Sequence, residues 1–383
     1  MNTVNEDETI KIIMKKLNCN CIKRIGKGAY GSVYHIKNKS GNYALKLIKI
    51  NRQKEKNDPQ RYQKTIEKIR YELDSSIDLK SKYIIKTVQI FEYKYDLEDN
   101  DLKNFPQFIV CFGIIMEKAA FNDLNFLIHL YKKKILFNSR MNNHPLFLTM
   151  SDLTIKFFIN QIILGLEFLN RSFLIHADIK PENILLNYGF TTKITDLSTL
   201  TAIKKNSDLI LPSGTFCFQG PEYYEDQKKI NSKDSEKIDI FALGIIIYYM
   251  KYFIYPMNQN NKAQLNKNEV IRILNKEIKK ISNDSNISPE LKELVIKMIE
   301  PDISKRATIE DILGNKWLNE EKEIIDKIHR LNEGEDVKLF IEFQKYDKKF
   351  YEKKKKEENI NYNFLFLCIN SIFDIYKIPY IYI

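Results

Sequence analysis

The first feature of the sequence with clear chemical meaning is a glycine-rich run, Gly26-Lys27-Gly28-Ala29-Tyr30-Gly31-Ser32-Val33. Glycine lets the backbone come close to phosphate oxygens, which the backbone N–H groups can then bind. Dinucleotide-binding folds use the same G-x-G-x-x-G spacing, but there a helix follows the glycines directly. Here a β-rich run follows, which favours a hairpin that covers phosphates. An ordinary glycine hairpin without a ligand is the other alternative.

A lysine within an apolar strand is the second such feature. Lys46 ends the run Tyr43-Ala44-Leu45-Lys46, and an ammonium among apolar neighbours must find an anion or lose its charge. Two anions suit it, a nucleotide phosphate and a carboxylate on the next predicted helix. Glu72, 26 residues later, is the preferred carboxylate, and Glu67 is a rival. The alternative without function is a lysine whose stem is buried while its head reaches water.

The third feature is a cluster of polar residues just after a long predicted helix. Asp178, Lys180 and Asn183 lie within six residues, and Asp196 follows thirteen residues after Asn183. Further motifs follow in the order Gly214-Thr215, Gly220-Pro221-Glu222, Asp239 and Arg306.

With these motifs in this order, the sequence resembles the eukaryotic protein kinases of the Ser/Thr branch, over about residues 18 to 318. Each motif alone is weak, whereas the ordered set is highly specific. The resemblance implies an α+β, bilobal protein-kinase-like fold with a small β-rich N-lobe and a larger helical C-lobe. It also implies ATP and Mg²⁺ as cofactors and a protein substrate that carries Ser or Thr.

The resemblance further implies a role for each polar residue in the catalytic set. Lys46, held by Glu72, would bind the α- and β-phosphates, and Asn183 and Asp196 would bind Mg²⁺ through their oxygens. Asp178 would orient the substrate hydroxyl and accept its proton.

Two further residues of the set would act beside Asp178. Lys180 would stabilise the γ-phosphate, and Thr215 would hydrogen-bond near Asp178 and Lys180 and shape the substrate groove. The Asp-x-Lys-x-x-Asn loop followed by Gly-Thr favours Ser/Thr over Tyr as the acceptor.

A nucleotide pocket is implied by the same resemblance. Val33 and Ala44 would lie above the adenine and Leu185 below it. The backbone of the hinge would bond the adenine edge at Glu117 and Ala119, after the gatekeeper Met116. The other expected nucleotide-binding positions belong to the glycine-rich hairpin and are Ile25, Gly26, Lys27, Gly28 and Gly31.

Three residues are expected to support this site without touching the substrate. Glu222 and Arg306 should form a buried ion pair in the helical lobe, and Asp239 should bond the backbone of the catalytic loop.

Several positions depart from the family pattern. Ala177 stands where most relatives carry an Arg that pairs with a phosphorylated activation loop, and Leu211 stands where the phosphothreonine usually sits. We therefore expect that activity does not need phosphorylation at that position, although Ser207 and Ser213 remain candidates for modification. Ser198 replaces the usual Gly after Asp196-Leu197, which removes some backbone freedom.

Strands are predicted where β-branched and apolar residues alternate, at Ile22–Ile25, Ser32–Ile36, Tyr43–Ile50, Ile84–Phe91 and Phe108–Met116. Helices are predicted where apolar residues recur at helical spacing or form long runs, at Thr65–Leu79, Leu124–Tyr131, Leu153–Phe173, Phe241–Tyr252, Pro289–Glu300 and Thr308–Trp317. Polar insertions are expected at Asn51–Gln60, Tyr95–Pro106 and Lys132–Pro145. The expected organisation is an N-terminal segment (1–17), an N-lobe (18–117), a C-lobe (118–318) and a charged extension with an apolar tail (319–383).

Composition places the 383-residue chain among globular proteins. Its 44% hydrophobic and 29% charged residues exclude a wholly disordered chain and a multi-spanning membrane protein. The net charge of +11 comes from lysines spread along the chain, so no nucleic-acid partner is expected. Five cysteines without regular spacing indicate a reducing compartment, hence an intracellular, cytoplasmic or nuclear protein.

The tail Phe364–Ile383 is apolar and about as long as a membrane helix. Asp374 and Lys377 lie inside it and Pro379 breaks its last turn, so a segment packed on the protein or lying at an interface is favoured over membrane anchoring.

Three readings compete with an active protein kinase. The main one is a pseudokinase or scaffold that keeps the fold without phosphoryl transfer. A small-molecule kinase of similar fold and a non-enzymatic nucleic-acid-binding protein are the others.

Overall fold

The structure is a computed structural model that describes residues 4–28, 31–51, 58–94, 108–132, 150, 152–187, 190–212, 214–225, 228–257 and 265–320. The predicted insertion Tyr95–Pro106, most of Lys132–Pro145 and the tail Phe364–Ile383 lie outside these residues. The chain divides into two compact units. The first unit holds Met1–Ala119 and Asp196–Ser198, and the second holds Ala120–Thr195 and Thr199–Ile383.

The first unit is built on a five-stranded antiparallel sheet with strand order β1-β2-β3-β5-β4. Its strands are β1 (Asn20–Gly28), β2 (Gly31–Asn38), β3 (Gly41–Asn51), β4 (Thr87–Lys94) and β5 (Phe108–Glu117). All five strands expected from the sequence are present, although β4 begins at Thr87 rather than at Ile84. In the sheet register, Lys46 lies opposite Val33 on one side and Ile114 on the other.

One face of this sheet is covered by a helix that the sequence analysis did not predict. Helix α1 (Val4–Leu17) buries Ile10, Ile13 and Met14 in a cluster with side chains from three strands. Those strand residues are Tyr34, Ile36, Leu45, Leu47, Cys111 and Ile115. Because successive strand residues point to opposite faces, α1 covers the face opposite to that of Lys46.

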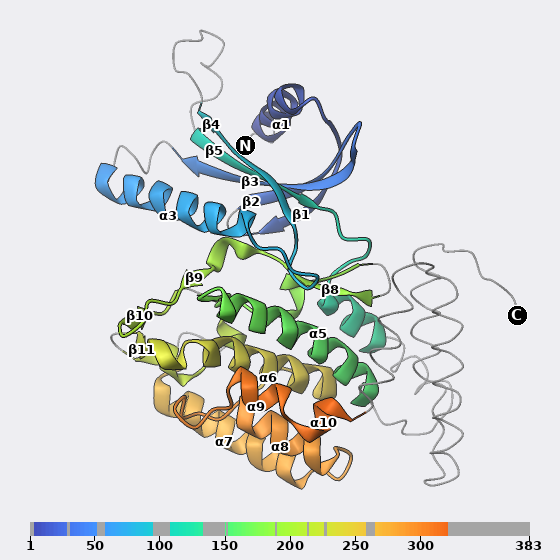
Figure 1. The fold of residues 1–383 in the computed structure, drawn as a ribbon, viewed down its shortest axis with the longest axis vertical. Coiled ribbons are helices and arrows are strands. Elements are labelled where there is room, and N and C mark those ends of the chain that lie inside the picture. Colours follow the sequence, from blue (N-terminus) through green and yellow to red (C-terminus); the bar gives the residue numbers. More distant parts are fainter. Residues whose placement is uncertain are drawn as a thin grey trace, which may run out of the picture. The chain divides into compact units, whose positions relative to one another are not determined.

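Helix α3 (Pro59–Ile77) lies on the other side of the sheet from α1 (Figure 1). It begins six residues earlier than the predicted start at Thr65. The predicted loop Asn51–Gln60 contains Pro59, but proline suits the first turn of a helix, where its missing N–H costs nothing. Among the side chains of α3 that the structure describes, the buried apolar ones are Ile66 and Leu73.

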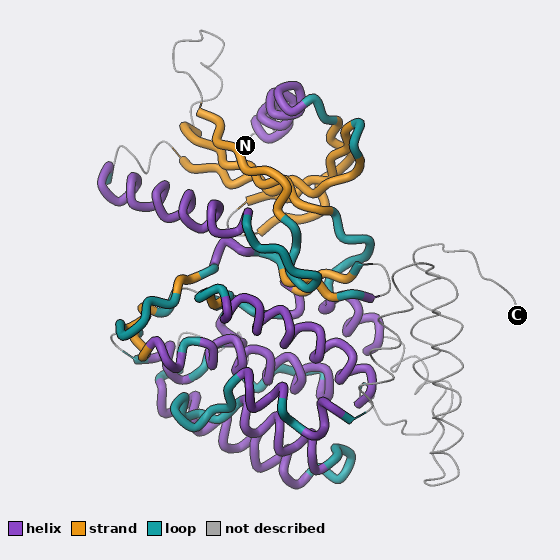
Figure 2. Tube along the Cα trace, in the orientation of Figure 1, coloured by secondary structure: helices purple, strands orange, loops and turns teal. Residues whose placement is uncertain are grey.

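Helices dominate the second unit (Figure 2). They are a helix over 124–132, α5 (Asp152–Arg171), α6 (Glu236–Tyr252), α7 (Lys267–Asn283), α8 (Pro289–Met298), α9 (Ile309–Leu313) and α10 (Lys316–Asn319). In α6, every residue from Lys237 to Met250 is buried, as its continuous apolar sequence predicts.

The structure differs from the sequence analysis at two places in this unit. Helix α7 was not predicted, although Asn266 and Glu269 form a capping box and Val270, Leu274 and Ile281 are buried along one face. The single helix predicted at Thr308–Trp317 is divided into α9 and α10, because Gly314 and Asn315 end one helix and cap the next.

Short strands and 3₁₀ turns complete the second unit. Three antiparallel pairs join β6 (Leu174–Ile175) to β9 (Thr201–Ala202), β7 (Ile184–Leu186) to β8 (Thr192–Ile194), and β10 (Asp208–Ile210) to β11 (Lys229–Asn231). The 3₁₀ turns are η2 (Pro181–Asn183), η5 (Phe216–Phe218), η6 (Pro221–Tyr224) and η7 (Ser232–Asp234), with η4 (Leu197–Thr199) at the boundary of the units. In the part of the chain that the structure describes, no helix combines the length and apolar character needed to cross a bilayer.

Candidate active site

The centre of the candidate site is the carboxylate of Asp178, which is only 9% exposed. Lys180 Nζ donates to its Oδ2 at 2.7 Å, and the backbone N–H of Thr215 donates to its Oδ1 at 2.7 Å. Lys180 Nζ also donates to Thr215 Oγ1 at 2.7 Å. The three residues therefore form a closed hydrogen-bonded group around one carboxylate, and the expected contact of Thr215 with Asp178 and Lys180 is present.

Asn183 is fixed to the same carboxylate. Its Nδ2 donates to the backbone oxygen of Asp178 at 2.8 Å and lies 3.3 Å from Asp178 Oδ2. Pro181 opens the 3₁₀ turn η2 that carries Asn183, where its fixed φ favours the turn. Because the amide nitrogen faces Asp178, the remaining polar atom of the side chain is Oδ1, an oxygen of the kind that Mg²⁺ prefers.

The backbone of the loop that carries Asp178 is held by Asp239, which is 3% exposed. Its two carboxylate oxygens accept the N–H groups of His176 at 2.7 Å and Ala177 at 2.8 Å. Ala177 has a left-handed φ of 61°, which is uncommon for a residue with a Cβ and must be imposed by its surroundings. Burial raises the pKa of Asp239, and the His176 ring and the two N–H donors oppose that rise. The expected bond between Asp239 and the catalytic loop is confirmed.

The second group of candidate residues lies in the first unit, around Lys46 on β3. Lys46 is 8% exposed, its Nζ forms an ion pair with Asp196 Oδ1, and it lies 3.2 Å from Ser198 Oγ. Ser198 Oγ in turn donates to Asp196 Oδ1 at 2.6 Å. The anion that Lys46 needs is therefore Asp196 among the described residues. Glu72 lies on α3, but its side chain is outside the described residues, so its expected pairing with Lys46 stays a prediction.

The glycine-rich run forms a hairpin between β1 and β2, as expected from the sequence. Gly26 pairs with Val33, and Gly28 pairs with Gly31. A Cβ on Gly31 would stand 2.0 Å from the backbone oxygen of Leu47 on β3, so only glycine fits there. The tip of the hairpin, residues 29–30, lies outside the described residues.

The expected adenine-binding residues are distributed over both units. In the first unit, Ala44 on β3 pairs with Met116 on β5, and both are buried. The N–H of Glu117 donates to Lys86 O at 3.0 Å, and its side chain accepts the Lys86 N–H at 2.8 Å. Leu185 lies on β7 of the second unit. Ala44 and Met116 are thus neighbours in the sheet, whereas Leu185 belongs to the other unit.

A comparison with known families identifies this arrangement. The family model described as "Protein kinase domain" matches residues 19–318 of the chain. The chain belongs to the protein kinase family. Its α+β architecture, with a five-stranded N-lobe sheet and a helical C-lobe, is the bilobal fold of that family, so the fold predicted from the sequence is confirmed.

Individual relatives of this kinase are distant. It is 27% identical over 302 residues to the serine/threonine-protein kinase atg1 of Dictyostelium discoideum, a match that covers 78% of this chain and 38% of that protein. It is 23% identical over 300 residues to the Aurora kinase of Candida glabrata, covering 78% of this chain and 70% of that protein. The match to ATG1 of Saccharomyces cerevisiae is 26% identical and covers 88% of this chain and 38% of that protein. The kinase thus spans well under half the length of the two relatives named atg1.

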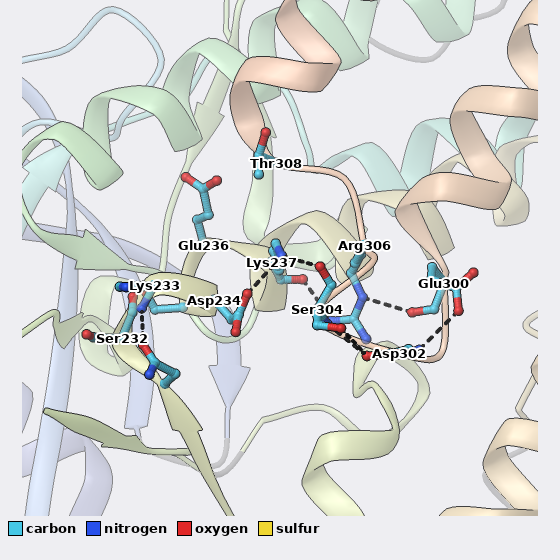
Figure 3. A network of polar contacts seen from close by, with 12 residues as sticks. Ser232, Lys233, Asp234, Glu236, Lys237, Glu300, Asp302, Ser304, Arg306 and Thr308 are labelled. Atoms are coloured by element: carbon cyan, nitrogen blue, oxygen red, sulfur yellow. Dashed lines mark hydrogen bonds and ion pairs between the residues drawn. The ribbon is translucent and has the colours of Figure 1, made fainter. Parts of the chain in front are cut away.

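The Gly-Pro-Glu segment of the kinase is fixed by the expected buried ion pair, which is confirmed. Arg306 NH1 and NH2 each donate to a Glu222 oxygen at 2.9 Å, and the Arg306 side chain is 0% exposed. Arg306 also donates to the backbone oxygens of Lys237 at 3.0 Å and Glu300 at 3.1 Å. Figure 3 shows this guanidinium beside Lys237, whose Nζ bonds Asp234 and the backbone oxygen of Ser304. The guanidinium of Arg306 therefore links the start of α6 to the 300–306 loop.

The sequence analysis missed the side-chain role of Ser198. It treated this residue only as a loss of backbone freedom, yet the hydroxyl bonds both Lys46 and Asp196. The available signal was a hydroxyl two residues after Asp196, the carboxylate that the sequence analysis expects to bind Mg²⁺. The replacement of the usual glycine adds a hydrogen-bonding group next to the two charged residues.

Proposed function

We propose that this kinase transfers the γ-phosphoryl group of Mg²⁺-ATP to a Ser or Thr hydroxyl of a protein substrate. The observation that carries the proposal is the Asp178 carboxylate with Lys180, Asn183 and the Thr215 N–H arranged on it. Phosphoryl transfer depends on alignment and charge neutralisation rather than on covalent catalysis. A buried carboxylate beside a lysine provides both for an acceptor hydroxyl.

On the acceptor side, Asp178 would orient the substrate hydroxyl and accept its proton. Lys180 lies 2.7 Å from the Asp178 carboxylate and would neutralise charge on the transferred group. The N–H of Thr215 keeps Asp178 Oδ1 in place, so Oδ2 is the oxygen on the side of Lys180.

On the nucleotide side, Mg²⁺-ATP supplies the phosphoryl group with part of its charge neutralised by the metal. Lys46 would bind the α- and β-phosphates, with Glu72 as its second partner. Asp196 and Asn183 would bind the metal through oxygen atoms. This donor set fits Mg²⁺, which is commonly held by one or two carboxylates together with substrate phosphates.

The adenine would lie against the apolar residues Val33, Ala44 and Leu185. Because the N–H of Glu117 is bonded to Lys86 O, its contact with the adenine edge would use the carbonyl, and Ala119 would supply the second backbone contact. Met116 would limit the depth of the pocket. The triphosphate would run under the hairpin formed by Ile25, Gly26, Lys27, Gly28 and Gly31.

Specificity for Ser and Thr is supported by two observations. Lys180 and Thr215 bond one another beside Asp178, as expected for the Ser/Thr branch. The relatives from Dictyostelium discoideum and Saccharomyces cerevisiae are both named serine/threonine-protein kinases. We place the N-lobe at 18–117 and the C-lobe at 118–318.

The test is a transfer assay with purified protein, Mg²⁺-ATP and a peptide library in which Ser, Thr or Tyr is the acceptor. The wild-type chain should label Ser and Thr peptides. Asp178→Asn should lower the rate by about 10²–10⁴-fold, because it removes the proton acceptor, while ATP binding stays nearly intact. Asp78→Asn is the matched control, because Asp78 is an exposed carboxylate of the first unit.

The result also separates an active enzyme from a pseudokinase. If the wild-type chain binds ATP but labels no more peptide than Asp178→Asn does, a pseudokinase that acts as a scaffold is favoured. Labelling that survives Asp178→Asn would refute the assignment of the catalytic residue.

A further inference from the structure

The segment that follows Asp196 is fastened to the second unit at its start. Strand β9 pairs with β6, with Leu174 opposite Ala202 and Ile175 opposite Thr201. The N–H of Ile203 then donates to Phe173 O at 2.8 Å. These bonds tie the segment to the strand that leads directly into the catalytic loop.

The middle of the segment is fastened by a second strand pair, β10 with β11 (Figure 1). Leu209 pairs with Ile230, and the N–H of Leu211 donates to Lys228 O at 2.8 Å. Leu209 is 7% exposed and Leu211 is 6% exposed, whereas Ile210 between them is 68% exposed. This alternation directs two leucines inward and leaves one isoleucine in solvent.

The two buried leucines, which we call the apolar anchor, belong to a hydrophobic cluster that includes residues of the catalytic loop. They belong to one buried cluster with Ile175, Ala177, Tyr223, Ile230 and Ile238. Ala177 lies directly before Asp178, and its N–H is held by Asp239. The cluster therefore adds apolar contact between the segment, the loop that carries Asp178 and the start of α6 to the hydrogen bonds that Asp239 makes.

The anchor stands close to the point where the segment reaches the catalytic carboxylate. Thr215, four residues after Leu211, donates its N–H to Asp178 Oδ1 at 2.7 Å. A Cβ on Gly214 would stand 2.8 Å from the backbone oxygen of Ala177, so the segment passes very near the loop there. Only three residues separate Leu211 from Thr215, so the anchor limits how far the chain can carry Thr215 away from Asp178.

We propose that Leu211, with Leu209, is a positioning residue that holds Thr215 on Asp178, so that the segment is ordered for catalysis without any covalent modification. The inference rests on the proposed function and specifies how its site is regulated. Burial of leucine side chains stabilises the ordered segment in every modification state, because it needs no phosphate and no charged partner. In this arrangement the unmodified chain is already active.

The experiment uses the full chain, treated with phosphatase and shown by mass spectrometry to carry no phosphate. Wild type is compared with Leu211→Ser, with the matched control Ile210→Ser at the exposed neighbouring position, and with the conservative Leu211→Met. Four quantities are measured for each protein, namely kcat and KM in the transfer assay, hydrogen exchange of the amides in residues 208–215, and the melting temperature.

We expect the unmodified wild type to be active and its 208–211 amides to exchange slowly. Leu211→Ser should lower kcat by about 10- to 100-fold with little change in KM for ATP, because Thr215 is misplaced relative to Asp178. Its exchange should accelerate within 208–215 while the melting temperature shows that the rest of the chain is folded. Leu211→Met should keep both kcat and the slow amide exchange close to wild type. The kcat of Ile210→Ser should stay within about twofold of wild type.

Three results would overturn the inference. They are rapid exchange of 208–211 in the unmodified wild type, equal effects of Leu211→Ser and Ile210→Ser, and a wild type that gains activity only when this segment is phosphorylated. If no preparation transfers phosphate but the exchange follows Leu211 as expected, the proposed function fails while the anchor stands.

Discussion

At the scale of single residues, the site depends on charges that are taken out of water in pairs. Lys46 is 8% exposed, and an unpaired ammonium at that depth would be costly. Asp196 and Ser198 supply an anion and a hydroxyl, which fix the orientation of the Lys46 side chain. The buried carboxylate of Asp178 likewise accepts hydrogen bonds from Lys180 and from the Thr215 N–H.

Replacing Lys46 by methionine tests this account of the first unit. Lys46→Met keeps the apolar stem and removes the charge, so phosphoryl transfer should fall by about 10²–10³-fold through loss of charge stabilisation. The chain should stay folded, because Asp196 is still partly exposed and bonded to Ser198. Transfer rates and thermal unfolding measure the two effects.

The control for this prediction is Lys37→Met, since Lys37 is an exposed lysine on β2, the strand next to β3. It should change neither the rate nor the stability. A Lys46→Met protein that transfers phosphate at the wild-type rate would contradict the role given to this lysine.

At the scale of elements, helix α1 forms a second layer that covers the apolar face of the five-stranded sheet. Strands β2, β3 and β5 present apolar side chains on the face opposite Lys46, and α1 covers them with Ile10, Ile13 and Met14. The helix therefore contributes to the N-lobe core, although it precedes the part of the chain that matches the family.

Ile13 provides the test of this packing, because it is 1% exposed. Ile13→Ala should lower the free energy of unfolding by about 2–5 kcal/mol, since it removes buried methyl groups and leaves a cavity. Denaturant unfolding measures the change. Lys11→Ala, at an exposed position of the same helix, should have almost no effect. Equal and small effects of both changes would show that α1 is not packed on the sheet.

At the scale of the whole chain, distant segments are joined by a few buried polar contacts. Glu222 and Arg306 lie 84 residues apart in the sequence and form a two-pronged ion pair with no exposed surface on the arginine. Arg306 also donates to two backbone oxygens. Its loss would therefore leave these two oxygens and the Glu222 carboxylate without the donor that they share.

Breaking this pair should be far more costly than breaking an exposed one. Arg306→Leu should lower the free energy of unfolding by about 3–5 kcal/mol, because Glu222 remains buried without its partner. Lys297→Leu, which breaks the exposed pair with Glu293, should cost at most about 0.5 kcal/mol. Thermal unfolding compares the two variants.

The double variant Arg306→Leu/Glu222→Leu completes the test. If the uncompensated charge dominates the penalty, the double variant should be more stable than Arg306→Leu alone. A double variant that is less stable than either single variant would show that the two residues stabilise the fold mainly through contacts other than their ion pair.

The five strands, most of the helices and the identity of the candidate residues could be predicted from the sequence, because they rest on local signals. Period-two alternation indicated the five strands, and the ordered motifs indicated Asp178, Lys180, Asn183 and the pair Glu222 and Arg306. Motif spacing carries this information, since each polar group must follow its strand or helix at a set distance along the chain.

Which side chains meet could not be predicted from the sequence, because the contacts join residues far apart along the chain. The partner of Lys46 lies 150 residues away, the role of Ser198 depends on that meeting, and the apolar anchor joins residues from 175 to 238. Helix α1 looked like a separate segment because its partners are strands elsewhere in the sequence. The hydrophobic effect is non-directional. Sequence periodicity therefore shows that one face of an element is apolar, but not which other element will pack against that face.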